Sequence, residues 1–438
     1  MLLDLAVAAE LPSTLLTTLP SAALAFADQA DNAAGPLFAG SLVPYLIFLY
    51  FVCQDCNGLD RAAKVTRHAL HHVINSSNAP DRVLPQAGFA SLLAFVTATV
   101  VASIVAKTQY GTTLANVDWL HASAESLLTF TNIADVIGLK LTLDAAIRGD
   151  GPMLRQSLPA PAPAPASAPV PAPSGLPLGV GSGGGGGGVP LGVGFFGCFL
   201  AALAAGQAVG LGVHAPFLGG VGDLPAGAWG VGFSEPENAL SLPTWVIHVS
   251  SLLEWLVAMG LVWRIGLVTG NPRWQGLTWA MIPSHASGVA ACAYHVFYNA
   301  PDLQSVVLLQ AALTFLGNAT LALAAYRLAA SNGWRPQLPF GEPAVAAASA
   351  SQQPDAAAPV ATAAVAVDSS SGTVVAIAQL ALVSVGLSYA IKYGGALLPL
   401  TREAPWWAAA GLIALPTALN ANKWRERSAE GGDFDGFV

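Results

Sequence analysis

Residues 238–328 read NALSLPTWVIHVSSLLEWLVAMGLVWRIGLVTGNPRWQGLTWAMIPSHASGVAACAYHVFYNAPDLQSVVLLQAALTFLGNATLALAAYRL. Short turns rich in Pro, Gly and Asn divide this stretch into three apolar runs of about twenty residues each, a length that matches the hydrocarbon thickness of a bilayer. In lipid, a helix satisfies its own backbone polar groups. The stretch therefore predicts three closely connected transmembrane helices.

These three helices carry ionisable and amide side chains, which are costly in lipid. They are His248, Glu254, His285, His295, Gln310 and Asn318. Such groups tend to face the interior of a helix bundle, so we expect a functional site here. His285 has small neighbours on its helix and is expected to be a buried, hydrogen-bonded histidine.

The composition extends this prediction to the whole chain. Charged residues make up 10% of the 438 residues, against about 25% in ordinary soluble domains. Four scattered cysteines do not form a disulfide framework. We therefore predict an all-α, polytopic transmembrane helical bundle of about nine spans. The predicted spans are 37–52, 87–106, 113–139, 195–213, 242–263, 277–297, 303–326, 374–391 and 406–419, and the last of them is expected to be interrupted by Pro416.

Two segments of biased composition divide the chain into modules. Residues 149–192 alternate Ala and Pro and then become Gly-rich, and residues 336–372 are rich in Ala, Pro and Ser. Neither can build a core, so both are expected to be disordered linkers. They separate a three-helix module (36–148), a four-helix module (193–335) and a two-helix C-terminal extension with its tail (373–438).

Residues 1–35 contain no Lys or Arg, which is atypical of a transit peptide or of a signal peptide with a basic start. The segment nevertheless ends its apolar part with Ala25-Phe26-Ala27, the small-x-small pattern of a signal-peptidase site. We interpret it as a possible remnant of a targeting segment.

The third predicted span has a polar stripe. Asp118, His121, Glu125, Asn132 and Asp135 recur at spacings of three, four and seven, so they lie along one side of a helix. His121 and Glu125 are one turn apart, a spacing at which a carboxylate can orient an imidazole. This stripe must line the bundle interior, water or a partner.

Charge placement fixes the expected topology. With the N-terminus outside and nine spans, inside segments hold 14 of the 17 Lys and Arg residues. Only Lys107, Lys392 and Arg402 remain outside. This asymmetry follows the positive-inside rule and predicts a C-terminus on the inside.

In this topology, polar side chains of several helices fall at one depth, in the outer half of the bilayer. This predicted polar layer comprises His121, His248 and His295 together with Asp118, Glu125, Glu254, Gln310 and Asn318. Three hypotheses remain open: a structural network, ligation of chlorophyll, haem or a metal by the three histidines, or a path for protons or solutes. Helices packed 8–10 Å apart leave no room for a macrocycle between two axial histidines unless they splay.

A second, weaker metal candidate lies after the first span. Cys53, Cys56, His68 and His72 follow the pattern C-x2-C-x11-H-x3-H, which approaches a two-Cys, two-His zinc site. Cys53 lies at the membrane edge and no hairpin signal follows, which favours a polar loop.

Enzymatic and nucleic-acid motifs are missing from the sequence. The six-Gly run is not a phosphate loop, because no strand precedes it and no Gly-Lys-Ser/Thr follows. There is no H-E-x-x-H or G-x-S-x-G motif, and no basic patch for nucleic acid. The sequence therefore favours a non-enzymatic protein.

The quoted stretch resembles the hypothetical chloroplast open reading frame forty-nine family of cyanobacteria and plastids. The resemblance covers about 90 residues, 238–328. It rests on Asn238 to His248, Ser250-Ser251, Glu254-Trp255, Tyr294 to Asn299, Leu309 to Thr314 and Gly317-Asn318. Residues 388–394 with Leu415-Pro416 resemble the C-terminal extension of plant members.

The front of the chain resembles a second uncharacterised family from the same organisms. The matching residues are Ser41 to Tyr50, Tyr110-Gly111, Ala115 to His121 and Ser123 to Glu125. The segment 55–86 is longer than is usual in that family, which weakens the zinc interpretation.

These two resemblances imply a chloroplast membrane, with the thylakoid as the expected location, a lumenal N-terminus and a stromal C-terminus. Neither family implies an activity. We expect a scaffold or assembly factor that contacts membrane lipid and subunits of photosynthetic complexes, and that holds chlorophyll or haem. The alternative is a transporter of small solutes or ions that uses the buried His and Glu side chains.

Overall fold

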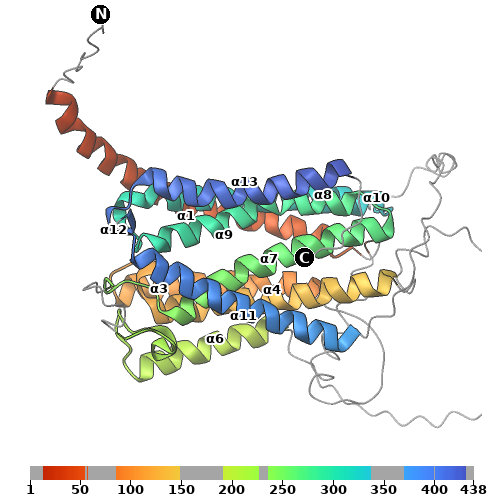
Figure 1. The fold of residues 1–438 in the computed structure, drawn as a ribbon, viewed down its shortest axis with the longest axis horizontal. Helices are drawn as coiled ribbons and strands as arrows, with labels where there is room; N and C mark the ends of the chain where they lie inside the picture. The colour runs from red at the N-terminus through yellow and green to blue at the C-terminus, as the bar shows by residue number, and fades with distance from the viewer. Residues whose placement is uncertain are drawn as a thin grey trace, which may run out of the picture.

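The structure is a computed structural model and contains only helices and turns over the residues it describes. Those residues are 13–54, 57, 85–147, 191–225, 235–336, 369–398 and 400–430. The helices run along a common direction and form one elongated bundle (Figure 1). The predicted all-α class is confirmed.

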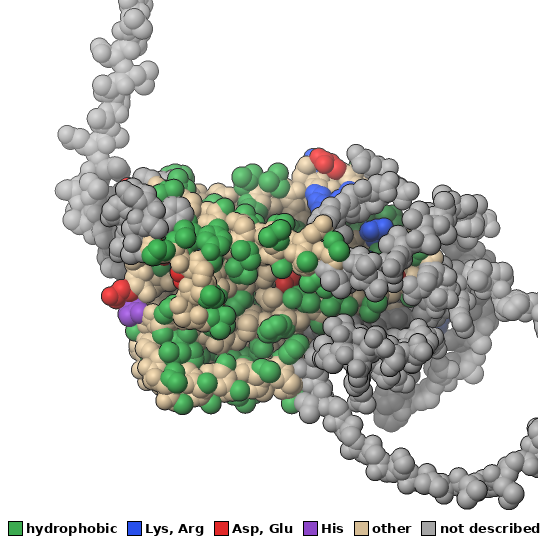
Figure 2. Space-filling view, turned by 60° about the horizontal axis from the view of Figure 1, so that its bottom comes forward, with side chains coloured by type: hydrophobic (Ala, Val, Ile, Leu, Met, Phe, Trp, Pro, Cys, Tyr) green, Lys and Arg blue, Asp and Glu red, His purple; other side chains and the backbone are tan. Residues whose placement is uncertain are grey.

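Six of the described helices contain a stretch long and apolar enough to cross a membrane, by length and composition. They are α1 (Ser13–Val52), α3 (Pro85–Gln109), α4 (Asp118–Ile147), α7 (Leu242–Thr269), α10 (Gln304–Ser331) and α11 (Ser369–Ala396). Figure 2 shows apolar side chains spread over the visible flank of the bundle, with few charged ones. A lipid-facing flank has this composition.

The remaining predicted spans fall on shorter or more polar helices. These are α6 (Leu191–Ala208), the pair α8 (Arg273–Ala280) and α9 (Ile282–Val296), and α13 (Trp406–Glu430), which follows the one-turn α12 (Leu400–Glu403). They lie alongside the six long helices (Figure 1). The figure of nine spans stays a prediction.

Several helices differ from the sequence-based expectation. α1 begins at Ser13 and therefore includes residues 13–35, which were assigned to a separate N-terminal segment. The helix expected over 277–297 is interrupted at Met281, just before Pro283, which has no N–H to donate to the preceding turn. The Met281 carbonyl accepts a hydrogen bond from Trp255 Nε1 of α7 at 3.1 Å. In contrast, α13 runs past Pro416, where we expected an interruption, and continues to Glu430.

The segments assigned to separate membrane modules pack into one core. α1 packs against α10, and α4 packs against α7. Buried side chains from both segments belong to one apolar cluster, which includes Tyr45, Phe48, Phe89, Leu139, Leu143, Met259, Trp263, Trp274, Leu328 and Trp424. The two segments therefore share their interior.

Three sequence predictions concern residues outside the described ranges. These are most of the two predicted linkers (residues 149–192 and 336–372), the first 12 of the 35 residues interpreted as a targeting remnant, and three of the four ligands of the zinc candidate, Cys56, His68 and His72. The described ends of the linkers differ from the prediction, because residues 191–192 begin α6 and residues 369–372 begin α11.

The two ends of the bundle differ in charge. We call the end that holds Asp118, Ser241 and Asn299 the histidine end, because the histidines described below lie near it. The opposite end, where α8 begins at Arg273 and α10 ends just after Arg327, is called the arginine end. Most described basic side chains lie toward the arginine end, in the last two turns of a helix or just beyond, namely Lys140, Arg264, Arg327, Arg335, Lys423, Arg425 and Arg427.

Close contact between α9 and α10 generates a stability prediction. A Cβ at Gly317 would lie 2.1 Å from Ser284 Oγ and 2.8 Å from its backbone nitrogen, whereas a Cβ at Gly386 in α11 meets nothing within 4 Å. Gly317→Ala is therefore expected to lower the thermal midpoint in detergent. Gly386→Ala should keep or raise it, because Ala is the better helix former by about 1 kcal/mol. Equal midpoints for the two variants would contradict the close packing.

Candidate functional site

Three histidines from three helices meet inside the bundle. His121 of α4, His248 of α7 and His295 of α9 have ring centroids 4.8–5.0 Å apart. One nitrogen from each ring lies within 4.8 Å of the others. All three side chains are buried, with 5–8% of their surface exposed. We call this group the histidine cluster.

The position of each ring follows from its helix. His121 is at the fourth residue of α4, and His248 is two turns from the start of α7. His295 is in the last turn of α9. Because α4 and α7 begin at the end of the bundle where α9 finishes, the three rings reach the same depth.

A hydrogen bond fixes which nitrogen of His295 is free. His295 Nδ1 lies 2.7 Å from Asn299 Oδ1, while Asn299 Nδ2 donates to the Ala115 carbonyl at 2.8 Å and to Asn116 Oδ1 at 3.0 Å. Because a main-chain carbonyl can only accept, the amide of Asn299 must point this way. Nδ1 of His295 therefore carries the proton, and Nε2 keeps its lone pair.

The other two rings also present nitrogens without a hydrogen-bond partner among the described atoms. These are His121 Nδ1 and His248 Nε2, both fully buried. The opposite nitrogen of His121, Nε2, lies 3.8 Å from Glu125 Oε1. This distance is longer than a hydrogen bond, but it places the carboxylate beside the ring nitrogen opposite Nδ1, as the one-turn spacing of His121 and Glu125 indicated.

From the histidine cluster toward the arginine end, polar contacts continue between α4 and α7. Thr129 Oγ1 lies 3.1 Å from Ser251 Oγ and 3.3 Å from Ser250 Oγ, and Asn132 Nδ2 donates to the Ser251 carbonyl at 3.4 Å. Glu254, 1% exposed, is one turn further along α7. The polar stripe of α4 thus faces α7 and avoids lipid.

Two carboxylates at this depth each keep one oxygen without a hydrogen bond among the described atoms. These oxygens are Glu254 Oε2 and Asp135 Oδ1. Burying a carboxylate oxygen without a partner costs free energy. A proton on the carboxylate or an ion beside it would explain why this oxygen has no hydrogen bond.

Asp118, predicted as part of the polar layer, holds loops together at the histidine end. Its carboxylate accepts hydrogen bonds from the backbone N–H groups of Phe217 at 2.7 Å and Ser241 at 3.2 Å. Ser241 is the residue before α7, so Asp118 fixes the start of the helix that carries His248.

The other residues of the predicted layer lie elsewhere. Asn318 of α10 donates to the Ser41 carbonyl of α1 at 3.0 Å. The backbone carbonyl of Gln310 accepts a hydrogen bond from Ser287 Oγ at 3.0 Å. His285, which was not part of the predicted layer, is buried and lies 3.5 Å from Asn420 Nδ2 of α13. The structure therefore does not join these residues to the histidine cluster.

Sequence reasoning gave no role to Asn299, although it supports His295 directly. Tyr298 and Asn299 both adopt positive φ, +53° and +57°. Asn is enriched in this left-handed region, so the Asn-Ala-Pro turn after α9 offered a weak signal.

A buried lysine at the histidine end was also missed. Lys392 of α11 is 6% exposed and donates to Glu235 Oε2 at 2.8 Å and to the Leu240 carbonyl at 2.7 Å. Its Nζ also lies 3.6 Å from Asp223, whose carboxylate accepts from the Leu242 N–H. These bonds tie the C-terminal extension to the start of α7.

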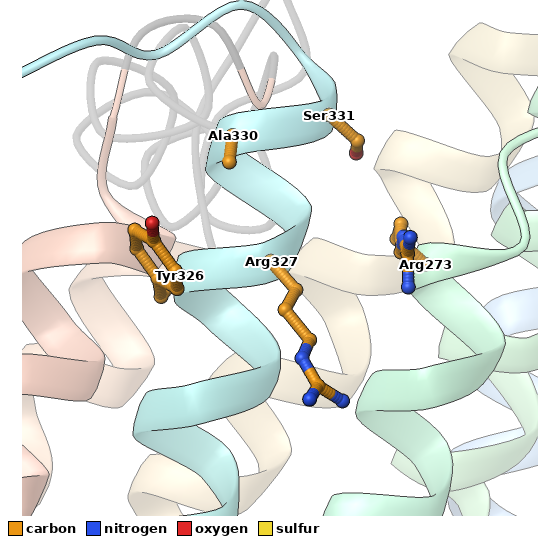
Figure 3. Close-up of a pocket in the computed structure, with 5 residues that line it drawn as sticks. All are labelled: Arg273, Tyr326, Arg327, Ala330 and Ser331. Atoms are coloured by element: carbon orange, nitrogen blue, oxygen red, sulfur yellow. The ribbon is translucent and has the colours of Figure 1, made fainter.

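An open pocket of about 450 Å³ lies at the arginine end, far from the histidine cluster. It is lined by Arg273, Tyr326, Arg327, Ala330 and Ser331, and Figure 3 shows the two arginines on adjacent helices, α8 and α10. The pocket is shallow and exposed, and the unpartnered imidazole nitrogens of His121 and His248 lie at the other end of the bundle. We therefore place the candidate site at the histidine cluster.

The histidine cluster fits a transition-metal ion. Three neutral imidazoles suit Zn, Cu, Fe or Ni, and three-histidine sites occur for zinc. In a tetrahedral zinc site with Zn–N bonds of 2.0–2.1 Å the ligand nitrogens are about 3.3 Å apart. The nitrogens lie within 4.8 Å of one another here, so the rings would have to move closer together to bind such an ion.

The fold and this cluster together define a class: an all-α membrane protein whose helices enclose a group of buried histidines. Comparisons with known proteins then give the family. Residues 239–327 match a family described as "Protein of unknown function (DUF2499)", and residues 34–144 match one described as "Protein of unknown function (DUF3593)".

Two relatives carry the Ycf49 name. A Ycf49-like protein of Synechocystis sp. (strain ATCC 27184 / PCC 6803 / Kazusa) is 49% identical over 89 residues, which are 20% of this chain and 86% of that protein. The uncharacterized protein ycf49 of Cyanophora paradoxa is 32% identical over 84 residues, 19% of this chain and 82% of that protein. No solved structure matches significantly.

This chain belongs to the Ycf49-like family and carries the second family, DUF3593, in the same polypeptide. The two family resemblances stated for residues 238–328 and for the front of the chain are confirmed. The resemblance of residues 388–394 and Leu415-Pro416 to the C-terminal extension of plant members stays a prediction.

The role of Asp118 can be tested by stability. Asp118→Ala leaves the N–H groups of Phe217 and Ser241 without their acceptor, so we expect a loss of about 1–3 kcal/mol, read as a lower thermal midpoint. Asp144→Ala is the matched control. It removes a part-buried ion pair with Lys140 one turn away on the same helix, and such pairs contribute about 0.3–0.5 kcal/mol. A midpoint for Asp118→Ala no lower than that of the control would contradict this role.

Proposed function

We propose that the protein is a non-enzymatic membrane protein that holds one divalent transition-metal ion at His121, His248 and His295. The observation that carries this proposal is the convergence of three buried imidazoles, two of which keep a nitrogen with no partner among the described atoms. Asn299 and Glu125 would orient two of the rings. When bound, the ion would supply a Lewis-acidic or redox centre or a structural crosslink.

The spacing of the rings favours an ion over chlorophyll or haem. The rings lie against one another with centroids about 5 Å apart, and a planar macrocycle is much wider than this gap. The charge of a divalent ion in a bilayer must be offset nearby, and the carboxylates of the partly buried Glu125 and the buried Glu254 could do this.

For the biological setting, we propose a plastid or cyanobacterial membrane, with the thylakoid as the specific location. The Ycf49-named relatives and the apolar helices support the membrane. We propose nine spans, with α6, the α8–α9 pair and α13 crossing in addition to the six long helices. The basic side chains near the arginine end support a stromal C-terminus and a lumenal N-terminus under the positive-inside rule.

Within that membrane we propose a role as a scaffold or assembly factor for photosynthetic complexes. This role is motivated by the lack of a catalytic motif in the sequence and by the broad apolar flank, which can contact lipid or other helices (Figure 2).

Metal binding by the purified protein tests the site. After exposure to Zn²⁺ or Co²⁺ and removal of free ions, we expect about one ion per chain by elemental analysis, and a visible Co²⁺ spectrum of low-coordinate nitrogen ligation. His248→Ala removes one of three ligands and should lower the affinity at least about 100-fold, since changes in outer ligands alone cost 10–100-fold.

The matched control is His214→Ala. His214 lies in a loop at the histidine end. Its side chain is half exposed and lies 3.3 Å from Glu237. An equal loss of metal in both variants, or no metal in the parent protein, would refute the metal site.

Transport of protons or solutes remains a second candidate, because Glu254 and Asp135 extend the line of buried polar groups along α4 and α7. Affinity purification with mass spectrometry and an absorption spectrum of the same eluate separates these roles. The scaffold predicts co-purifying photosystem subunits. Proton flux in proteoliposomes that is lost in Glu125→Gln but kept in the exposed control Glu237→Gln would instead support transport.

A further inference from the structure

The histidine cluster is divided between the two families. His121 lies within residues 34–144, which match DUF3593, whereas His248 and His295 lie within residues 239–327, which match DUF2499. The hydrogen bonds that position His295 also involve both segments, because its partner Asn299 donates to Ala115 and Asn116. Neither segment contains the complete group.

Hydrogen bonds join the same two segments at several depths. Asn318 donates to the Ser41 carbonyl at 3.0 Å, Asn238 Nδ2 lies 3.4 Å from Asn116 Oδ1, and Thr129 contacts Ser250 and Ser251. Without the other segment, Asn318 and Thr129, which lie within long apolar helices, would lose these partners and face lipid, where an unsatisfied polar group costs several kcal/mol.

The apolar contact is equally shared. Leu139 and Leu143 of α4 and Phe48 of α1 are at most 1% exposed and belong to the cluster formed by Met259, Trp263 and their neighbours. This interface resembles the interior of one domain more than a contact between independent modules.

The two relatives contain only one of these segments. The matched stretches of 89 and 84 residues cover 86% and 82% of them, so each relative is about 100 residues long. Residues 34–144 and 239–327 together are too long to fit in such a protein. A relative of this size would expose the polar face that α4 covers here.

We infer that residues 34–144 act as the partner subunit of the Ycf49-like segment. The linker then joins in one polypeptide two segments that can also assemble as separate chains. The partner of a short Ycf49-like protein is then a membrane protein resembling residues 34–144. It presents a helix with the Asp-x-x-His-x-x-x-Glu pattern of Asp118, His121 and Glu125. The inference rests on packing and hydrogen bonds, and a bound metal would add to it.

Cleavage of the linker in the full chain tests this inference. A specific protease site placed within residues 149–190 is cut in the membrane, and the protein is then extracted in a mild detergent. We expect the two fragments to purify together through a tag on the C-terminal one, and the metal content and thermal midpoint to match those of the uncut chain. Fragments that separate while each stays monodisperse would overturn the inference.

A mixing experiment tests whether the two fragments purify together only because they share a detergent micelle by chance. Cut tagged protein is mixed after extraction with an excess of cut protein that has no tag and a mass-labelled N-terminal fragment. The label should be absent from the tagged eluate, because paired fragments do not exchange; its rapid appearance would also overturn the inference. Fragments that stay paired but bind no metal would support the partnership while refuting the proposed metal site, so the two failures are distinguishable.

Discussion

The structure depends on one constraint: a polar side chain inside a bilayer must find its partner within the protein. α4 carries Asp118, His121, Glu125, Asn132 and Asp135 along one side, and this side cannot face lipid at an acceptable cost. α7 covers the stripe with serines, His248 and Glu254, and the start of α7 is held by Asp118. The pairing of α4 with α7 therefore sets the register of the bundle.

The free energies of the contacts show that one kind of interaction stabilises the bundle and another fixes the alignment of its helices. Hydrogen bonds between membrane helices contribute on average about 0.6 kcal/mol each, so the few bonds between α4 and α7 cannot hold the fold alone. Close packing of buried side chains such as Phe48, Leu143 and Trp274 supplies most of the attraction. The polar contacts exclude other registers, because a slip of one turn would leave several groups without partners. The histidine cluster is a consequence of that register.

The sequence was sufficient to predict features that depend on residues close to one another in the chain. Runs of apolar residues predicted helix positions, and the spacing of His121 and Glu125 predicted that they meet on one face of α4. The convergence of His121, His248 and His295 was anticipated only as a shared depth, since residues 47 to 174 positions apart on three helices carry no local signal of contact. For the same reason the pairing of Asn318 with α1 could not be foreseen. Pro416 misled, because a helix tolerates proline where neighbouring helices support it.

The most direct test of the account is a disulfide between α4 and α7. Thr129→Cys and Ser251→Cys, introduced together in a protein without its native cysteines, place two sulfurs where the hydroxyl oxygens now lie 3.1 Å apart. The account predicts efficient oxidation in the membrane, seen as a link between fragments after linker cleavage, and none when Ser251→Cys is paired with Phe130→Cys, whose side chain is exposed. Failure of the first pair to link, or equal linking of both pairs, would contradict the register on which the histidine cluster depends.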